Sequence, residues 1–240
     1  MNPVVYRNLL DRFYLRQRDI CDKASLIPVG IIGCGASGSA IGILLAKLGV
    51  PNMVLYDGDR VEDHNLPNQY YPNDSVGKNK AKALKDVIQQ YVPTELLPMV
   101  VAFDRHFTED DVINTRIVFM LVDGLDERRK IFKKLKRCNS VEWVIDTRMG
   151  AEYYEVHCIN MKSAMEIAMY ESAIRNASPS PLPCTGRSVI YNVMSMGALA
   201  VSMFKKMVAG EQPPRMIGYD LRNNIQIIDD SNITRRVIRL

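Results

Sequence analysis

Short apolar runs, separated by stretches with helical spacing, organise residues 1–150 of the chain. The runs expected to form buried strands lie at 29–32, 53–56, 96–103, 117–122 and 143–145. Between them, apolar residues three or four positions apart predict helices at 39–48, 81–92 and 127–138, with a short one opening at Thr108. Strands that alternate with helices favour a parallel sheet covered on both faces. We therefore predict an α/β fold with a Rossmann-like, doubly wound sheet.

The C-terminal residues follow a different pattern. Residues 151–161 alternate as a half-buried strand does, while 162–176 and 188–208 have helical spacing. Two short apolar runs, 218–220 and 225–228, flank a polar turn and predict a terminal hairpin. Because tight hairpin connections join antiparallel strands, we expect this part of the sheet to be mixed or antiparallel.

The clearest chemical signal is the glycine-rich turn after the first apolar run. The turn extends from Gly33 to Gly38 with the sequence GCGASG, and the second apolar run ends in Asp57. Gly33 and Gly35 let the backbone turn tightly and approach a phosphate, and Gly38 lets helix and strand pack closely. The helix N-terminus attracts an anion, and Asp57 can accept both hydroxyls of a ribose. These residues predict a nucleotide site, for NAD, FAD or ATP.

The segment after Asp57 is dense in polar residues, and lysines follow it. Lys78, Lys80 and Lys82 enter the next predicted helix, where positive charge opposes the helix dipole. One such lysine is explained by surface solvation, but a cluster is easier to explain if a phosphate lies nearby. The segment therefore favours a polyphosphate ligand.

Two further acids, Asp123 and Asp126, follow the apolar run at 117–122. Ligands of open parallel sheets sit beyond the carboxyl ends of the strands, so these acids are placed to meet the nucleotide. Two carboxylates beside a polyphosphate suit Mg²⁺. A helix N-cap with Asp126 in the first turn explains the pair almost as well.

Composition excludes several other classes of function. The chain of 240 residues is 47% hydrophobic and 24% charged, as expected of a soluble globular protein. A net charge of +4 is too small to indicate nucleic acid binding. The most apolar stretch, 189–204, is shorter than a membrane span and predicts a buried helix. Five cysteines without a CxxC pair or a signal peptide predict a reducing, cytoplasmic location.

We expect one domain over residues 1–240. It comprises an N-terminal helical segment at 1–27, a nucleotide-binding half at 28–150, and a C-terminal half at 151–240 with a proline-broken loop at 177–187.

Taken together, these motifs resemble the ThiF/MoeB/HesA family, the adenylating core shared with ubiquitin-activating enzymes. The resemblance covers most of the chain and is densest from Arg16 to Asp126. The paired CxxC zinc ligands of the family are absent, so the chain is most similar to small, divergent bacterial or mobile-element members. Family membership implies binding of ATP and Mg²⁺ and a Rossmann-like adenylation domain.

The resemblance also assigns roles to individual residues. It implies a nucleotide site formed by Gly33, Gly35, Gly38, Asp57, Asp59, Asn65, Gln69, Lys80 and Asp123. Within the family pattern, Lys80 neutralises phosphate and Asp126 binds the metal. The basic segment 3–20, expected to be a helix outside the sheet, places Arg16 or Arg18 to reach the nucleotide of a second protomer across a homodimer.

Asn68 departs from the family pattern. The segment from Asn65 to Gln69 has Asn68 where the family has an arginine that neutralises charge in the adenylation transition state. Positioned cations of this kind contribute strongly to phosphoryl chemistry. Either another arginine takes its place or the chain binds nucleotide with impaired catalysis. The candidates for replacement are Arg16, Arg18, Arg60 and Arg148, the last just past a strand end.

Cys184 lies in the proline-broken loop. In many relatives a cysteine on such a segment accepts the activated carboxylate as a thioester, and the N-terminus of a following helix lowers the pKa of a thiol. An incidental loop cysteine is an equal alternative. We expect Cys34 and Cys158 to be packed, inert thiols.

The function implied by the resemblance is ATP-dependent adenylation of the C-terminal glycine of a ubiquitin-like or sulfur-carrier protein, with thioester transfer to Cys184 as an optional step. A nucleotide-binding pseudoenzyme or scaffold of the same fold is the first alternative, and Asn68 favours it. An NAD-dependent oxidoreductase is the second. The polar and lysine-rich residues 59–80 argue against it, since hydride transfer needs no such cluster.

Overall fold

The sheet contains nine strands within the part of the chain that the computed structural model describes, residues 3–17, 19–21, 26–176, 188–230 and 233–239. The strand order is β3-β2-β1-β4-β5-β6-β7-β8-β9. Neighbouring strands are parallel along β3, β2, β1, β4 and β5. Every pairing from β5 to β9 is antiparallel. The strands are β1 (Val29–Ile32), β2 (Asn52–Tyr56), β3 (Met99–Phe103), β4 (Ile117–Met120), β5 (Trp143–Gly150), β6 (Tyr153–Asn160), β7 (Met216–Asp220), β8 (Ile225–Asp230) and β9 (Ile233–Arg239).

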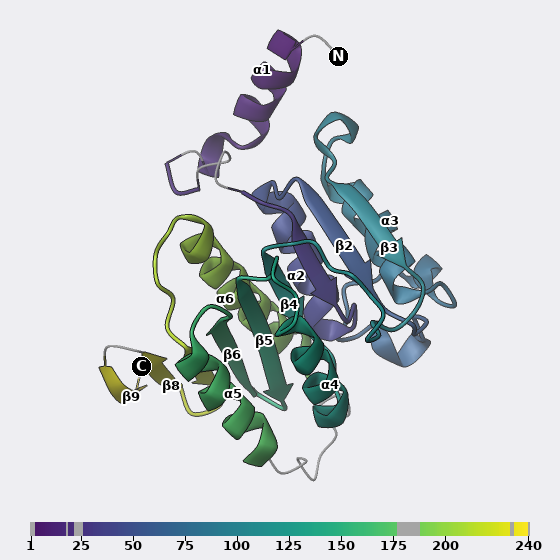
Figure 1. Ribbon diagram of the computed structural model, residues 1–240. Coiled ribbons are helices and arrows are strands. Elements are labelled where there is room, and N and C mark those ends of the chain that lie inside the picture. The colour runs from purple at the N-terminus through teal and green to yellow at the C-terminus, as the bar shows by residue number, and fades with distance from the viewer. Residues whose placement is uncertain (1–2, 18, 22–25, 177–187, 231–232, 240) are drawn as a thin grey trace.

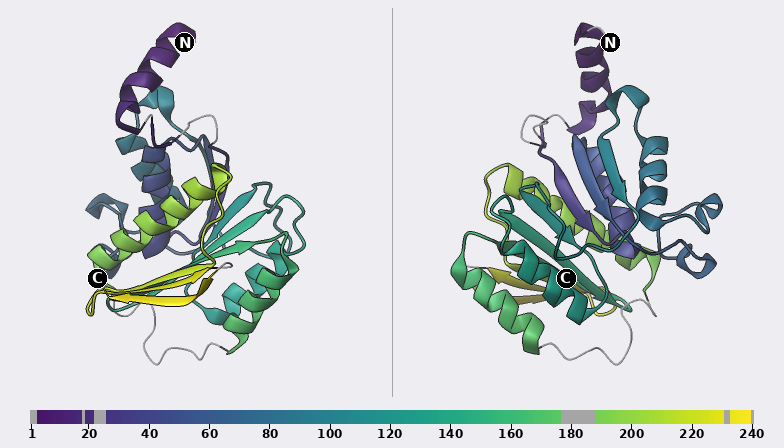
Figure 2. Two further views of the ribbon diagram at one scale, coloured as in Figure 1. Left: turned by 90° about the vertical axis from the view of Figure 1, so that its left-hand side faces the viewer. Right: turned by 45° about the vertical axis from the view of Figure 1, so that its right-hand side comes forward.

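Helices cover both faces of this sheet (Figures 1 and 2). On one face, α2, α3 and α6 pack around Leu45, Leu84 and Phe204; on the other, α4 and α5 pack around Phe132 and Tyr170. Helix α1 projects from the molecule at the end where the chain enters β1 (Figure 1). The helices are α1 (Pro3–Phe13), α2 (Ala36–Leu48), α3 (Lys80–Tyr91), α4 (Leu125–Leu135), α5 (Ala164–Asn176) and α6 (Ile190–Val208).

The structure confirms the predicted α/β fold with a doubly wound sheet and an antiparallel C-terminal part. No described helix is long and apolar enough to cross a membrane. The prediction of a short helix at Thr108 is wrong, because the structure has a turn there. The Asp111 carboxylate accepts hydrogen bonds from the Thr108 backbone N–H (2.7 Å) and from Arg105 (2.6 Å). These bonds close a turn with the same cap residues that would have started a helix.

Other elements differ from the prediction mainly in length. The N-terminal helix ends at Phe13 and is followed by a single 3₁₀ turn at Leu15–Gln17. Strand β5 continues past Asp146 to Gly150, because β6 pairs with it along its whole length. Strand β9 was not expected; it pairs antiparallel with β8 at the edge of the sheet.

The strand order places a topological switch between β1 and β4. After β1 the chain continues to β2, which lies on one side of β1. After β3 it crosses back to β4, which lies on the other side of β1. The segments that leave the carboxyl ends of β1 and β4 therefore diverge and open a crevice, where ligands of such sheets bind. Gly33, Asp57 and Asp123 follow the carboxyl ends of β1, β2 and β4 and meet at this crevice.

Candidate functional site

The three glycines after β1 have three different geometries. Gly33 has φ +96°, a left-handed conformation that favours glycine, and a Cβ there would lie 2.7 Å from the Leu121 carbonyl oxygen. A Cβ on Gly38 would lie 2.1 Å from the Gly33 carbonyl oxygen, so only glycine allows α2 to approach β1 this closely. A Cβ on Gly35 would meet no atom within 4 Å. Gly35 therefore exposes bare backbone to the crevice, at the N-terminus of α2 where no side chain caps the helix.

Asp57 is held in place by backbone hydrogen bonds. Its Oδ2 accepts from the Cys34 N–H (2.6 Å) and its Oδ1 from the Asp59 N–H (2.8 Å). The side chain is nearly buried, and this burial raises the pKa of Asp57, while the two N–H groups and Lys80 oppose the rise. Each carboxylate oxygen keeps a second lone pair, so Asp57 is fixed in position and still able to accept from a ligand.

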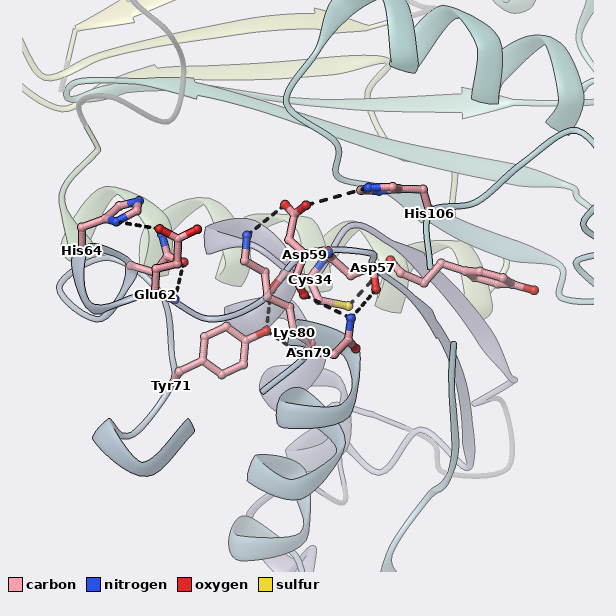
Figure 3. A network of polar contacts seen from close by, with 11 residues as sticks. Cys34, Asp57, Asp59, Glu62, His64, Tyr71, Asn79, Lys80 and His106 are labelled. Carbon is pink, nitrogen blue, oxygen red and sulfur yellow. Dashed lines mark hydrogen bonds and ion pairs between the residues drawn. The ribbon is translucent and has the colours of Figure 1, made fainter. Parts of the chain in front are cut away.

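Asn79 and Tyr71 join the glycine turn to α3. The Asn79 side chain caps α3 by accepting from the Lys82 N–H (3.1 Å), and its amide donates to the Asp57 carbonyl oxygen (2.7 Å). The Tyr71 hydroxyl donates to the Cys34 carbonyl oxygen (2.5 Å). Figure 3 shows these side chains between the glycine turn and α3. The first turn of α3, and with it Lys80, is therefore placed directly beside the crevice.

Lys80 reaches into the crevice from the first residue of α3. Its Nζ lies 3.1 Å from Asp59 Oδ2, and its side chain is only 12% exposed. His106 lies on the other side of the same carboxylate, with Nε2 3.8 Å from Asp59 Oδ1 (Figure 3). Asp59 therefore sits between two basic groups.

One cavity, of about 190 Å³, lies over the ends of β1, β2 and β4 and is called here the apolar cavity. Tyr56 and Phe107 contribute aromatic rings, packed edge to face at 5.1 Å between centroids. The full set of apolar side chains in its wall is Ile32, Tyr56, Phe107, Leu121, Val122 and Ile131. A flat apolar group, such as a base, fits these walls, with Asp57 at the position where a ribose would follow.

A second cavity, of about 380 Å³, adjoins the first and is called the polar cavity. It opens over the N-terminus of α2 and extends to the end of β5, at Thr147 to Met149. The two cavities share Gly35, Asp59, Lys80, Leu121, Val122 and Asp123. Bare helix N–H groups and a lysine therefore lie at their junction, where a phosphate chain would be stabilised.

Carboxylates outnumber the lysine in this region: Asp59 and Asp123 line both cavities with Lys80, and Asp57 lines the apolar cavity. Burial raises the pKa of Asp123; Lys80 and Arg128 counteract this, and Asp57 and Asp59 add to it. Among the described residues, no cluster of three or more His, Cys, Asp or Glu side chains forms a metal cage. The arrangement instead fits Mg²⁺, which uses one or two carboxylates and completes its shell with phosphates and water.

At the far wall of the polar cavity, Asp146 organises two arginines. Asp146 is fully buried and contacts Arg128, the Arg148 Nε (2.9 Å) and the Tyr170 hydroxyl (2.7 Å). Arg128 also donates to the carbonyl oxygens of Val122 and Thr147. This cluster ties the first turn of α4 to β5 and places Arg148 in the cavity wall.

Asn65, Asn68 and Gln69 all line the polar cavity. The Asn65 side chain accepts from the Glu62 N–H (3.0 Å) and closes a capping box on a 3₁₀ turn. Asn68 donates to the Ser188 hydroxyl (2.9 Å), which links it to the segment before α6. Asn68, which departs from the family pattern, thus lines the same cavity as Asn65 and Gln69, which match it.

Asp126 and Arg16 lie outside both cavities. Asp126 is 87% exposed and pairs with Arg129 (2.6 Å) on the first turn of α4. Arg16 is exposed, and its neighbour Gln17 donates to the Lys47 carbonyl oxygen at the end of α2 that points away from the crevice. Arg16 therefore lies at the far end of α2 from the site of its own chain.

The cysteines divide by burial. Cys34 and Cys158 are buried, and desolvation raises the pKa of both thiols, which agrees with the expected inert packing. Cys184 lies outside the described residues.

Several residues of the site have no sequence motif. Tyr56 and Phe107 belong to an ordinary strand and a loop, and Arg128 looks like one charge among many on α4. Asn79 carries a weak signal, because an asparagine before a helix is a common N-cap. A long-range hydrogen bond such as Asn79 to Asp57 is visible only in the fold.

Comparison with known proteins adds a family and a set of similar folds. The model of the ThiF family matches residues 6–233. Ubiquitin-like modifier-activating enzyme 5 of Caenorhabditis elegans is 30% identical over 60 residues, 25% of this chain and 14% of that protein. The Arabidopsis thaliana protein of the same name is 29% identical over 100 residues, 40% of this chain and 23% of its own length. These matches thus span less than a quarter of either relative.

Two solved structures share the fold over nearly the whole chain. PaaA has a TM-score of 0.66 at 19% identity and covers 98% of this chain and 72% of its own. Escherichia coli MccB, solved with AMPCPP and MccA, has a TM-score of 0.60 at 20% identity, covering 91% of this chain and 65% of its own.

Proposed function

The chain belongs to the ThiF family, and we propose that it adenylates the C-terminal carboxylate of a small protein or peptide, with ATP as the second substrate. One observation carries the proposal: two adjoining cavities share Asp59, Lys80 and Asp123. A nucleoside in the apolar cavity and a carboxylate in the polar cavity would meet at these charged residues. Of the similar folds, MccB has been solved with ATP and with MccA, which supports this pairing of ligands.

In the proposed complex the base occupies the apolar cavity, against the wall that includes Tyr56 and Phe107, and the ribose hydroxyls donate to Asp57. The phosphates lie over Gly35, where the backbone is bare and the α2 N-terminus attracts negative charge. Lys80, held beside Asp59 at 3.1 Å, neutralises phosphate charge. Gly33 and Gly38 act indirectly, because they hold this backbone in its conformation.

We propose Asp123 as the residue that holds Mg²⁺, in place of the family-based assignment to Asp126. Asp123 lines both cavities, whereas Asp126 faces solvent and pairs with Arg129. When bound, the metal would neutralise charge on the phosphates. Asn65 and Gln69 line the polar cavity together with Asp123.

The reaction needs no covalent bond to the protein. A carboxylate oxygen attacks the α-phosphorus in line, the bond from this phosphorus to the bridging oxygen breaks, and pyrophosphate leaves with the electron pair. Proximity and electrostatic stabilisation supply the rate. The protein contributes the fixed dipole of α2 and the Lys80 charge, both at the junction of the two cavities.

The proposed acceptor is a ubiquitin-like or sulfur-carrier protein that ends in glycine. A glycine end is narrow enough to thread into the polar cavity and flexible enough to extend. We further propose a homodimer in which Arg16 of one protomer approaches the nucleotide of the other, since it lies at the far end of α2 in its own chain. Transfer of the acyl group to Cys184 remains a proposed later step.

Pyrophosphate exchange tests the proposal directly. The chain is incubated with ATP, Mg²⁺, labelled pyrophosphate and a candidate partner ending in Gly-Gly, and label in ATP is counted. We expect exchange that depends on the partner and on its free C-terminus, with an amidated partner as the control. Absence of exchange with every glycine-ended partner, in a protein that binds ATP, would refute the enzymatic proposal.

A nucleotide-binding scaffold is the second candidate function, and Asn68 is the observation in its favour. An active enzyme that lacks a cation there should gain from Asn68→Arg, because the side chain lines the polar cavity. A scaffold should gain nothing. The measurement is the exchange rate of the variant against wild type, with unchanged thermal unfolding as the control for folding.

A further inference from the structure

The polar cavity contains buried polar atoms that the described part of the protein leaves without hydrogen-bond partners. Four of these atoms are Asn68 Oδ1, Gln69 Oε1, Thr147 Oγ1 and Arg148 Nη2, and all four residues line the cavity. Native proteins satisfy nearly all buried polar groups, so a cluster of exceptions around one cavity indicates groups that a ligand completes. The cluster includes both acceptors and donors, which points to a ligand that carries both.

Arg148 differs from the other cations of this cavity. Lys80 is paired with Asp59, Arg60 donates to the Gly77 carbonyl oxygen (2.7 Å), and Arg128 contacts Asp146 and two carbonyl oxygens. Arg148 uses its Nε for Asp146 at 2.9 Å, and the described residues provide no partner for its Nη2.

The Arg148 guanidinium is also fixed before any ligand arrives. The Arg148 Cζ lies 5.5 Å from the centroid of the Tyr170 ring, and the Tyr170 hydroxyl donates to Asp146. The ring and the carboxylate therefore both hold the guanidinium in position. The side chain is 19% exposed. A cation held in this way binds an oxyanion without losing rotamer freedom, which favours recognition of a carboxylate.

We infer that Arg148 is the substrate-contacting cation that binds the carboxylate of the incoming peptide, and that the side-chain amides of Asn68 and Gln69 bind its last peptide groups. The unpartnered amide oxygens of Asn68 and Gln69 accept from backbone N–H groups, so an extended peptide end satisfies them, while the Asn68 amide nitrogen donates to Ser188. The inference rests on the proposed adenylation and deepens it by naming the side chains of the polar cavity that contact the acceptor end. It also names the residue that supplies positive charge where Asn68 offers none.

Calorimetry with two probes tests this inference. The first is AMP, which fills the nucleotide site alone. The second is glycylglycyl-sulfamoyl adenosine, an unreactive mimic of the peptide adenylate. Its acyl oxygen, next to the anionic sulfamate, stands for the carboxylate oxygen that does not attack the phosphorus. The decisive quantity is the ratio of the two affinities, which a general loss of stability would not change. The variants are Arg148→Gln, Arg148→Lys, which keeps a charge for Asp146, and Arg116→Gln, which removes an exposed arginine paired with Glu142 far from the site.

We expect wild type and Arg116→Gln to prefer the mimic over AMP. Loss of a charged hydrogen bond should lower the affinity of both Arg148 variants for the mimic by about tenfold or more, with little change for AMP. If Arg148→Gln fails to fold, Arg148→Lys gives the same comparison. An unchanged ratio of affinities in a folded Arg148 variant would overturn this inference and leave the proposed function in place. Failure of wild type to bind AMP and ATP would overturn the proposed function and this inference with it.

Discussion

The two cavities differ in how completely the chain has prepared them. Around the apolar cavity, Asp57 accepts two backbone N–H groups, Asn79 donates to the Asp57 carbonyl oxygen, and Tyr71 donates to the glycine turn. Around the polar cavity, the described residues leave amide, hydroxyl and guanidinium groups without partners. The apolar cavity, the proposed nucleotide side, is therefore held by hydrogen bonds within the chain, whereas the polar cavity, the proposed acceptor side, keeps polar atoms that a substrate would pair.

This difference has a physical reason. A nucleotide is recognised by backbone N–H groups and a helix N-terminus, which exist as soon as β1 and α2 have folded. A peptide end must instead be recognised by side chains that hydrogen-bond to it. Until the peptide binds, the unpaired polar groups of these side chains destabilise the folded protein. We therefore expect substitutions on the nucleotide side to affect folding and binding together, and substitutions on the acceptor side to affect mainly the use of substrate.

The largest expected effect concerns the junction of the cavities. Asp123→Asn removes the carboxylate proposed to hold Mg²⁺ and should lower the pyrophosphate exchange rate by about 100- to 1,000-fold, the range seen for lost electrostatic stabilisation. Asp126→Asn removes an exposed acid three residues away and should have little effect. Exchange rates over a range of Mg²⁺ concentrations measure both. The opposite ranking of the two variants would place the metal at Asp126.

The next largest effect separates two glycines of one turn. Gly38→Ala places a Cβ 2.1 Å from the Gly33 carbonyl oxygen and should lower the free energy of unfolding by about 2 kcal/mol. Gly35→Ala places its Cβ in open space, so the fold should be kept while the methyl group obstructs a phosphate. Urea unfolding and ATP titration of both variants check this. Equal stabilities would show that the two glycines do not have separate roles.

The smallest effect lies behind the polar cavity, at Glu155. Burial alone would raise the pKa of Glu155, but hydrogen bonds with His157 (2.8 Å) and Tyr153 (2.6 Å) lower it from 4.5 to about 2. An acid whose pKa is lowered on folding stabilises the fold above its unfolded pKa, and this contribution disappears as the pH falls from 4.5 towards 2. Glu155→Gln should therefore cost about 1 kcal/mol at pH 7 and progressively less under acid conditions.

Thermal unfolding of wild type and Glu155→Gln between pH 7 and pH 2.5 measures this difference. Glu95→Gln, which alters an exposed acid, is the matched control. A gap between wild type and Glu155→Gln that stays constant as the pH falls would show that the charge of Glu155 does not stabilise the fold.

The sequence was sufficient to predict the elements around the glycine turn. A strand, a glycine turn, a helix and a second strand ending in Asp57 are local features, and local spacing specifies them. The same local reasoning failed at Thr108, where Asp111 pairs with Arg105 and closes a turn instead of starting a helix. Local spacing was thus sufficient for the strand-turn-helix pattern around the glycines, but not for choosing between two local uses of the same cap residues at Thr108.

The acceptor side could not be predicted in the same way. It is assembled from segments far apart in the chain, as the contact between Asn68 and Ser188 shows. Which acid of the Asp123 and Asp126 pair faces the cavity depends on where α4 begins, and a simple helix cap explained the sequence pattern almost as well. The grouping of Arg128 and Arg148 around buried Asp146 requires knowledge of the sheet register.

A calorimetric comparison of ATP with NAD, each in the presence of Mg²⁺, tests the central claim most directly. We expect ATP to bind at least about tenfold more tightly, because the junction beyond Gly35 offers a lysine and the carboxylates proposed to hold Mg²⁺, which a terminal triphosphate uses and a dinucleotide does not. Asp57→Asn should weaken the ATP signal. Equal or tighter binding of NAD would contradict the account and favour an oxidoreductase in the same fold.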